Sequence, residues 1–160
     1  MKELLIVWHS QFGGTAQMAS AARDGAEQAE AEDVLVTFKR AQDADSVDVL
    51  RCDAILIATS ENFGSLSGMT KDFLERVYYV CEHRVEGKPY SVIVCAGTDG
   101  SGAMFQTDRI ATGLRLRKVL PGVIYKSGVT AQSQTVPADV LATCSDLGAT
   151  LAAGLAAGIY

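Results

Sequence analysis

Apolar runs alternate with segments of helical periodicity along the 160 residues of the chain. Uninterrupted apolar runs are typical of parallel strands that are buried on both faces, and they predict strands at residues 4–8, 34–38, 53–59 and 90–96, with a fifth between 119 and 129. Apolar residues that recur every three or four positions predict helices at residues 15–30, 67–81, 103–116 and 138–157. This alternation favours one α/β domain, residues 1–160, in which helices cover both faces of a parallel sheet.

Glycines gather where three of the predicted strands end. Ligands of open parallel sheets bind at the carboxyl ends of the strands, so the loops after residues 4–8, 53–59 and 90–96 are the expected place for a site. Seven of the 15 glycines lie in or beside these loops: Gly13, Gly14, Gly64, Gly68, Gly97, Gly100 and Gly102. The sequence therefore predicts one site built from three loops.

The first of these loops, residues 9–16, has the composition of a phosphate-binding loop. Its glycines let backbone N–H groups turn inward, a helix N-terminus follows, and Ser10 and Thr15 add hydroxyl groups. The loop contains no lysine, which excludes a nucleoside-triphosphate loop of the Gly-Lys-Ser/Thr type, and no cysteine, which excludes a cysteine phosphatase loop. The alternative is a simple helix cap by serine or threonine.

Composition and charge exclude several further classes of protein and of site. A net charge of −5 argues against a surface that binds nucleic acid. The four cysteines show neither CxxC spacing nor histidine partners, so we expect buried thiols in a reducing cytoplasm, and neither a metal site nor disulfides. We expect no leader sequence before residue 4 and no membrane span, because the apolar C-terminal segment 147–160 is shorter than the ~18 residues that a spanning helix needs.

The first loop resembles that of the flavodoxin-like superfamily. Ser10, Gly13 and Thr15 match its S/T-x-x-G-x-T motif, which holds the phosphate of FMN through backbone amides and hydroxyls. The resemblance implies a three-layer fold with a five-stranded parallel sheet in the order 2-1-3-4-5. It also implies that the first loop binds cofactor through Ser10, Gln11, Phe12, Gly13, Gly14, Thr15 and Ala16.

The second loop and the helix after it, residues 59–76, are similar to a region of NAD(P)H-dependent FMN reductases and WrbA-like quinone reductases. Ser60 replaces the usual proline, and Glu75 stands where aspartate is common. The third loop, residues 96–102, resembles the loop that bonds the pyrimidine edge of the flavin in the same proteins. The resemblance implies flavin contacts from both loops: Ser60, Glu61, Asn62, Phe63 and Gly64, then Ala96, Gly97, Thr98, Asp99 and Gly100.

These resemblances imply an FMN-dependent oxidoreductase. NADH or NADPH would donate hydride, a quinone-like molecule would accept electrons, and the flavin itself would carry the chemistry, so no side chain is expected to be catalytic. The third loop has no aromatic residue to cover the flavin, which favours an enzyme over the alternative of a flavodoxin that only carries electrons. A regulatory flavin- or phosphate-binding module is a third possibility. The alanine- and leucine-rich last helix also suggests a homodimer or homotetramer.

For several residues near the predicted loops, a structural role is an alternative to a functional one. We expect Trp8 to belong to the core and His9 to be a strand-end residue with a satisfied hydrogen bond. Glu61 and Asp99 would lower the reduction potential of the flavin if they were ionised beside it, and the alternative is ordinary turn chemistry. For Cys95, next to the third loop, an inert thiol is expected.

Overall fold

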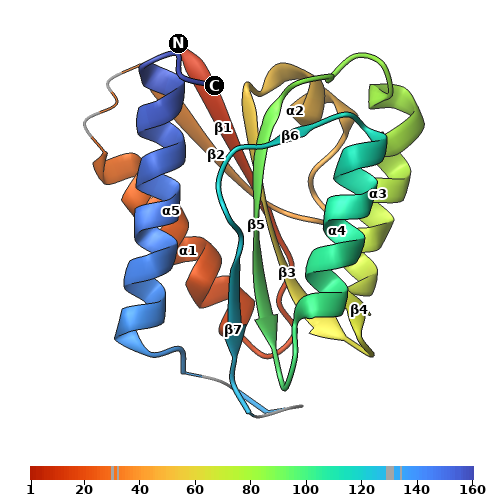
Figure 1. Cartoon of the computed structure of the whole chain (residues 1–160), viewed down its shortest axis with the longest axis vertical. Helices are drawn as coiled ribbons and strands as arrows, with labels where there is room; N and C mark the ends of the chain where they lie inside the picture. Colours follow the sequence, from red (N-terminus) through yellow and green to blue (C-terminus); the bar gives the residue numbers. More distant parts are fainter. Residues whose placement is uncertain (30, 32, 129–131, 134) are drawn as a thin grey trace.

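A parallel sheet forms the centre of the molecule in the computed structural model, which describes the chain except residues 30, 32, 129–131 and 134 (Figure 1). Its four long strands lie in the order β2-β1-β3-β5. Their bounds are β1 Lys2–Trp8, β2 Val34–Arg40, β3 Ala54–Asn62 and β5 Pro89–Ala96. The expected order is confirmed, and the carboxyl ends of these strands meet at the lower end of the molecule in Figure 1.

The fifth strand differs from the prediction because it is split. β6, Arg117–Lys118, and β7, Val123–Lys126, each pair in parallel with β5. Pro121 and Gly122 lie between them, and proline has no N–H to donate to a sheet. β7 lies within the range of 119–129 in which the fifth strand was expected, whereas β6 precedes this range, and residue 129 lies outside the described residues.

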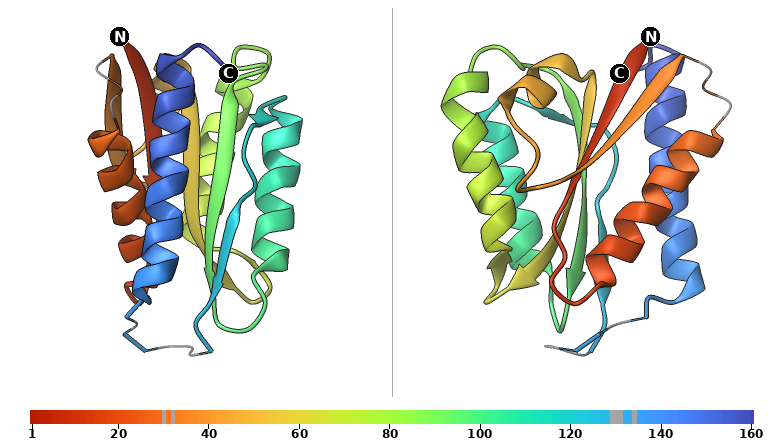
Figure 2. Two further views of the ribbon diagram at one scale, coloured as in Figure 1. Left: turned by 60° about the vertical axis from the view of Figure 1, so that its left-hand side comes forward. Right: turned by 180° about the vertical axis from the view of Figure 1, so that it is seen from behind.

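Helices cover both faces of the sheet, as Figure 2 shows from two sides. On one face lie α1, Gly14–Gln28, and α5, Ala138–Ala156. On the other lie α2, Ser46–Arg51, α3, Gly68–Cys81, and α4, Ser101–Gly113. The four predicted helices are confirmed with shifted ends. α1 ends before its predicted last residue, number 30, which lies outside the described residues, and α4 runs two to three residues earlier than predicted.

Two short elements were not expected. α2 is only six residues long, and its start is fixed by a capping box in which the carboxylates of Asp45 and Asp48 each accept a backbone N–H of the other residue. β4, Ser65–Leu66, pairs antiparallel with the end of β3, so residues 60–66 form a hairpin where we expected an open loop. The turn residues Phe63 and Gly64 both have positive φ, which is typical of a two-residue hairpin turn.

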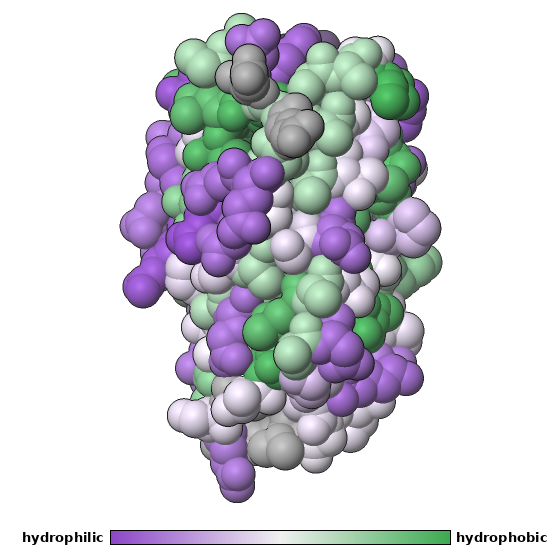
Figure 3. Space-filling model, turned by 90° about the vertical axis from the view of Figure 1, so that its left-hand side faces the viewer, coloured by the Kyte–Doolittle hydropathy of each residue, from purple (hydrophilic) through white to green (hydrophobic). Residues whose placement is uncertain are grey.

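The sheet is buried on both faces, which explains the uninterrupted apolar runs. Leu5 packs into a core with Phe73 of α3, whereas its neighbour Leu4 packs into a second core with Met18 of α1 and Leu151 of α5. α1 and α5 approach so closely that a Cβ atom at Gly148 would overlap the carbonyl oxygen of α1 residue 22. No helix in the described ranges is long and apolar enough to cross a membrane. On the side shown in Figure 3, polar side chains separate small apolar patches.

Candidate cofactor-binding site

The three predicted loops converge at one edge of the sheet. The backbone N–H of His9 donates to the carbonyl of Ala58 at 3.1 Å, which places the first loop beside the end of β3. Ser60 lies opposite Cys95 in the β3–β5 pairing, so the second and third loops leave the sheet side by side. Cofactor residues that were predicted from separate parts of the sequence therefore lie in one place.

The first loop leaves the start of α1 open. Ser10 Oγ accepts the N–H of Gly13 at 3.0 Å, and Gly13 itself is the N-cap with a φ of 94°. Among the residues that the structure describes, no side chain caps α1, so the helix-cap alternative is not what the structure shows for Ser10 and Thr15. The N-terminal N–H groups of a helix without a side-chain cap favour an anion such as phosphate.

Thr15 faces inward from the first turn of α1. It is 2% exposed, and its hydroxyl lies beside the thiol of Cys95 at the end of β5. This contact joins the first loop to the third. Burial raises the pKa of the Cys95 thiol, which agrees with the expected inert thiol.

Glu61 joins the second loop to the third. Its Oε1 accepts the N–H of Gly100 at 2.8 Å, and its Oε2 accepts the N–H of Ala103 at 3.0 Å. The carboxylate thus lies at the N-terminus of α4, where a negative charge is stabilised by the helix dipole. The N–H of Gly100, which we expected to face the flavin, is already bound to this carboxylate.

The tip of the second loop projects into solvent. Phe63 is fully exposed at the hairpin turn, and the hydroxyl of Ser65 donates to Gln106 of α4 at 2.5 Å. A Cβ atom at Gly102 would overlap the carbonyl oxygen of Gly64, so only glycine lets the hairpin approach α4 this closely. Phe63 is the one aromatic residue between positions 60 and 66.

In the third loop Asp99 behaves as a turn residue. Its carboxylate accepts the N–H of Ser101 at 3.3 Å and the hydroxyl of the same residue at 2.7 Å, and these bonds lower the pKa of Asp99. The loop is also held by the chain after β7, because Ser127 and Gly128 donate their N–H groups to the carbonyls of Ala96 and Gly97, each at 2.8 Å. Asp99 therefore makes the bonds of an ordinary turn residue, and its place beside the flavin stays a prediction.

His9 connects the first loop to the second through its ring. Nδ1 lies 3.0 Å from Ser67 Oγ, which agrees with the expected strand-end residue, and burial lowers the pKa of His9 below its usual 6.5. All four cysteines are free and buried, as expected, and burial raises the pKa of Cys52 and of Cys144 to about 12. Among the described residues, no three His, Cys, Asp or Glu side chains are grouped as metal ligands.

The residues present fit a bound FMN. Ser60 Oγ is buried at the carboxyl end of β3, and within the described part of the chain it has no hydrogen-bond partner. A buried hydroxyl without a partner costs free energy unless a ligand satisfies it. Together with the uncapped start of α1, this hydroxyl gives the converging loops unused hydrogen-bonding groups at both the first and the second loop.

The fold and the three loops define a flavodoxin-like α/β protein. Solved structures agree: a flavodoxin from the domain Archaea has a TM-score of 0.74 at 18% identity and covers 94% of this chain and 96% of its own. The flavodoxin, WrbA-like protein from Agrobacterium tumefaciens has a TM-score of 0.70 at 18% identity and covers 99% of each chain. At these identities the likeness concerns the fold alone.

The sequence comparison specifies the family. The chain belongs to the NADPH-dependent FMN reductase family, whose sequence model matches residues 44–131. This match includes the second and third loops, whereas the first loop lies outside it. A protein of Acidithiobacillus ferrooxidans named NAD(P)H dehydrogenase (quinone) is 29% identical over 121 residues, covering 64% of this chain and 60% of that protein. The chain thus spans well under two thirds of the length of this curated relative.

Proposed function

We propose that the chain is an FMN-dependent oxidoreductase that takes hydride from NAD(P)H and passes electrons to a quinone or a similar small acceptor. The observation that carries this proposal is the convergence of the three loops around the unpartnered hydroxyl of Ser60. Membership of the FMN reductase family and the name of the Acidithiobacillus relative support the nicotinamide donor and the quinone acceptor.

Each of the three loops would bind a different part of FMN. The N–H groups at the start of α1 and the hydroxyl groups of Ser10 and Thr15 would bind the phosphate without any cationic side chain. Ser60 and the hairpin after it would lie along one edge of the flavin, and residues 96–100 would lie along the other. When bound, FMN supplies the transfer of electrons between donor and acceptor, and the protein supplies position and electrostatics.

A flavodoxin-type electron carrier is the second candidate, favoured by the solved structures that share the fold. The sequence argues for the enzyme, because the third loop has no aromatic side chain to cover the flavin. In the second loop Phe63 points into solvent and leaves space for a nicotinamide or a quinone. We further propose that the protein acts in a reducing cytoplasm, in keeping with its four free thiols, and that it forms a homo-oligomer.

Anaerobic reduction distinguishes the candidates. The FMN-loaded protein is mixed with NADH or NADPH, and the visible absorption of the flavin is followed with time. Rapid bleaching, followed by recovery on addition of a quinone, is the expected result. Protein that chemical reductants bleach but neither nicotinamide does would be a carrier, and protein that takes up no FMN would overturn both candidates. A Ser60→Ala variant should bind FMN more weakly, whereas Ser91→Ala, at a buried serine of β5 whose hydroxyl donates to the carbonyl of Leu120, serves as the matched control.

A further inference from the structure

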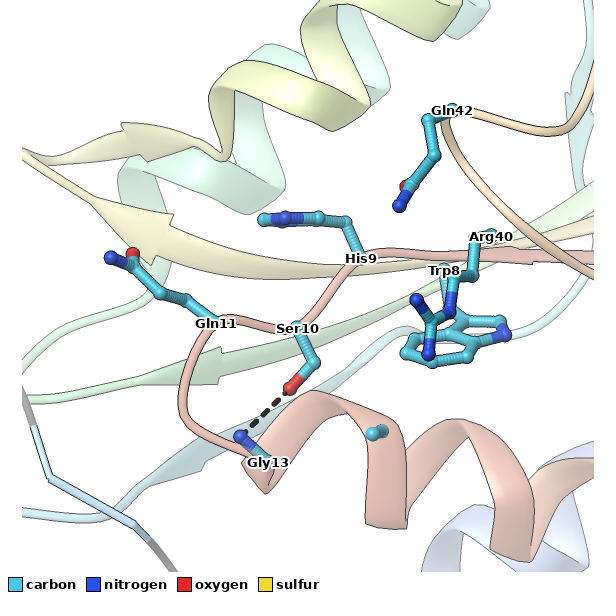
Figure 4. A pocket seen from close by; sticks show the side chains of 8 residues that line it. Trp8, His9, Ser10, Gln11, Gly13, Arg40 and Gln42 are labelled. Carbon is cyan, nitrogen blue, oxygen red and sulfur yellow. Dashed lines mark hydrogen bonds between the residues drawn. The ribbon is translucent and has the colours of Figure 1, made fainter.

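A cavity of about 320 Å³ lies beside the first loop, between the carboxyl ends of β1 and β2 (Figure 4). Its wall includes Ser10 and Gly13 of the first loop, and Arg40 and Gln42 at the end of β2. Because β1 separates β2 from β3 and β5 in the sheet, the cavity lies on the side of the first loop away from the other two loops. The flavin ring, which we expect beside the second and third loops, would therefore lie on the other side of the first loop.

Of the described residues that line the cavity, Arg40 is the only one with a charged side chain. Its guanidinium carbon lies 5.3 Å from the centre of the Trp8 ring, which in turn stacks on Phe38 at 5.4 Å between centres. Neighbouring Lys39 is paired with Asp48, whereas Arg40 has no carboxylate partner within the described ranges. A guanidinium that an aromatic ring holds in place, and that no carboxylate neutralises, is well suited to bind phosphate.

The cavity is too large for a phosphate alone. It corresponds to about ten water molecules at ~30 Å³ each, and it reaches the lower end of the range of about 300–1,000 Å³ that is typical of small-molecule sites. The cavity wall around Arg40 also contains three groups that can form hydrogen bonds: the imidazole of His9, the hydroxyl of Ser10 and the amide of Gln42. Such groups suit a ribose and a base attached to the phosphate.

We propose that this cavity binds the adenosine 5′-phosphate half of a dinucleotide, whose other half is either the flavin itself or a nicotinamide that lies against the flavin. The inference rests on the proposed function, because Ser10 and Gly13 belong both to the expected FMN phosphate loop and to the cavity wall. A second phosphate next to the first would meet Arg40. This adenosine phosphate can come from FAD, as a continuation beyond the flavin phosphate, or from NAD(P)H bound against FMN.

Binding measurements on three proteins test the proposal: the wild type, Arg40→Gln, and Arg23→Gln as the matched control. Arg23 lies over Phe38 at the other end of the same aromatic stack, 4.9 Å from its ring centre, and it does not line the cavity. The affinities of FMN and FAD are measured on the flavin-free protein, and the affinity of 5′-AMP is measured on the FMN-loaded protein.

The two sources give different results. If FAD is the source, the wild type binds FAD at least about tenfold more tightly than FMN, and Arg40→Gln removes the difference. If NAD(P)H is the source, FMN and FAD bind equally, 5′-AMP competes with NAD(P)H on the FMN-loaded protein, and Arg40→Gln weakens 5′-AMP about tenfold. Under either source, Arg23→Gln should bind FMN, FAD and 5′-AMP with the same affinities as the wild type.

The inference is overturned if the wild type shows no preference for FAD and no binding of 5′-AMP, or if Arg40→Gln alters neither. The proposed function is tested independently of the adenosine site, by measuring whether the wild type takes up FMN and whether NAD(P)H bleaches the bound flavin. A protein that passes those two tests and shows no role for Arg40 would retain its proposed function and lose only the adenosine site.

Discussion

Replacing Glu61 with glutamine tests how the second and third loops are held together. Each carboxylate oxygen accepts one backbone N–H of the α4 N-terminus, from Gly100 at 2.8 Å and from Ala103 at 3.0 Å. Glutamine keeps one acceptor oxygen and turns an NH₂ group, itself a donor, toward the other N–H. One of the two bonds is therefore lost, together with the negative charge at the start of the helix.

The size of the effect follows from these two contributions. A hydrogen bond to a charged group contributes about 1.5–3 kcal/mol, and a charge at a helix terminus about 0.3–1 kcal/mol. Because Glu61 is only half-buried, water replaces part of what is lost. We expect the free energy of unfolding of the flavin-free protein to fall by about 2 kcal/mol, measured by urea denaturation. Glu75→Gln is the matched control, since the Glu75 side chain is 70% exposed and should change stability by less than about 0.5 kcal/mol.

The same variant reports on the flavin. Loss of a negative charge from the two loops that we propose to flank the flavin should raise its reduction potential, because reduction adds electrons. A charge interaction of about 1 kcal/mol corresponds to about 20 mV in a two-electron couple, which spectroelectrochemistry resolves. Glu61→Gln with unchanged stability and unchanged potential would refute the reasoning, because the carboxylate would then be free in solution and not bound to α4.

Three further predictions follow from the packing and the charges. Gly148→Ala should lower the free energy of unfolding by about 1–3 kcal/mol in urea denaturation, because the added methyl group overlaps the carbonyl oxygen of Ala22, and an unchanged value would contradict the close α1–α5 contact. Glu3 is buried, and its pKa is lowered from 4.5, mainly because its carboxylate accepts hydrogen bonds from Arg51. The pair therefore stabilises the fold above pH 4.5. This contribution is lost as the pH falls through the lower pKa that Glu3 has in the folded state. Arg51→Ala should therefore lower the free energy of unfolding at pH 7 and flatten its loss below pH 4.5 in acid denaturation, and an acid transition like that of the wild type would contradict this. Thr15→Ala should weaken FMN binding by about 1.5–3 kcal/mol in a fluorescence titration, and Thr15→Ser should restore it; equal affinities in both variants would place the phosphate elsewhere.

The sheet could be predicted from the sequence because burial on both faces leaves a direct mark on it. Residues 4–7 all have to be apolar, since alternate side chains enter opposite cores. Short helices and strands produce weaker patterns in the sequence. The six residues of α2 are too few to show a helical period, although the carboxylates at positions 45 and 48 formed a recognisable capping pattern. The hairpin at residues 60–66 was missed because its turn places Phe63, an aromatic residue, at a positive φ that such residues rarely adopt.

Contacts between distant segments were beyond the reach of sequence patterns. The three loops could be predicted to converge because parallel strands carry their carboxyl ends to one edge. That Glu61 would bind α4 depends on how the hairpin leans on that helix, which no local pattern encodes. The glycine clusters predict a site at the loops after β1, β3 and β5, whereas the chain after β2 has no glycine before residue 64, so no sequence pattern indicates the cavity at Arg40.

The contacts between loops also bear on how a cofactor would bind. His9 joins the first loop to Ser67, Thr15 joins it to Cys95, and Glu61 joins the second loop to the third. Each loop is therefore held in place by its neighbours through contacts of the protein itself. Ordering a flexible segment at binding costs about 0.5–1.5 kcal/mol for each side chain that becomes immobilised, and loops that are already held in position avoid this cost. A site built in this way binds FMN through the few groups that the fold leaves unpartnered, foremost the hydroxyl of Ser60 and the N–H groups at the start of α1.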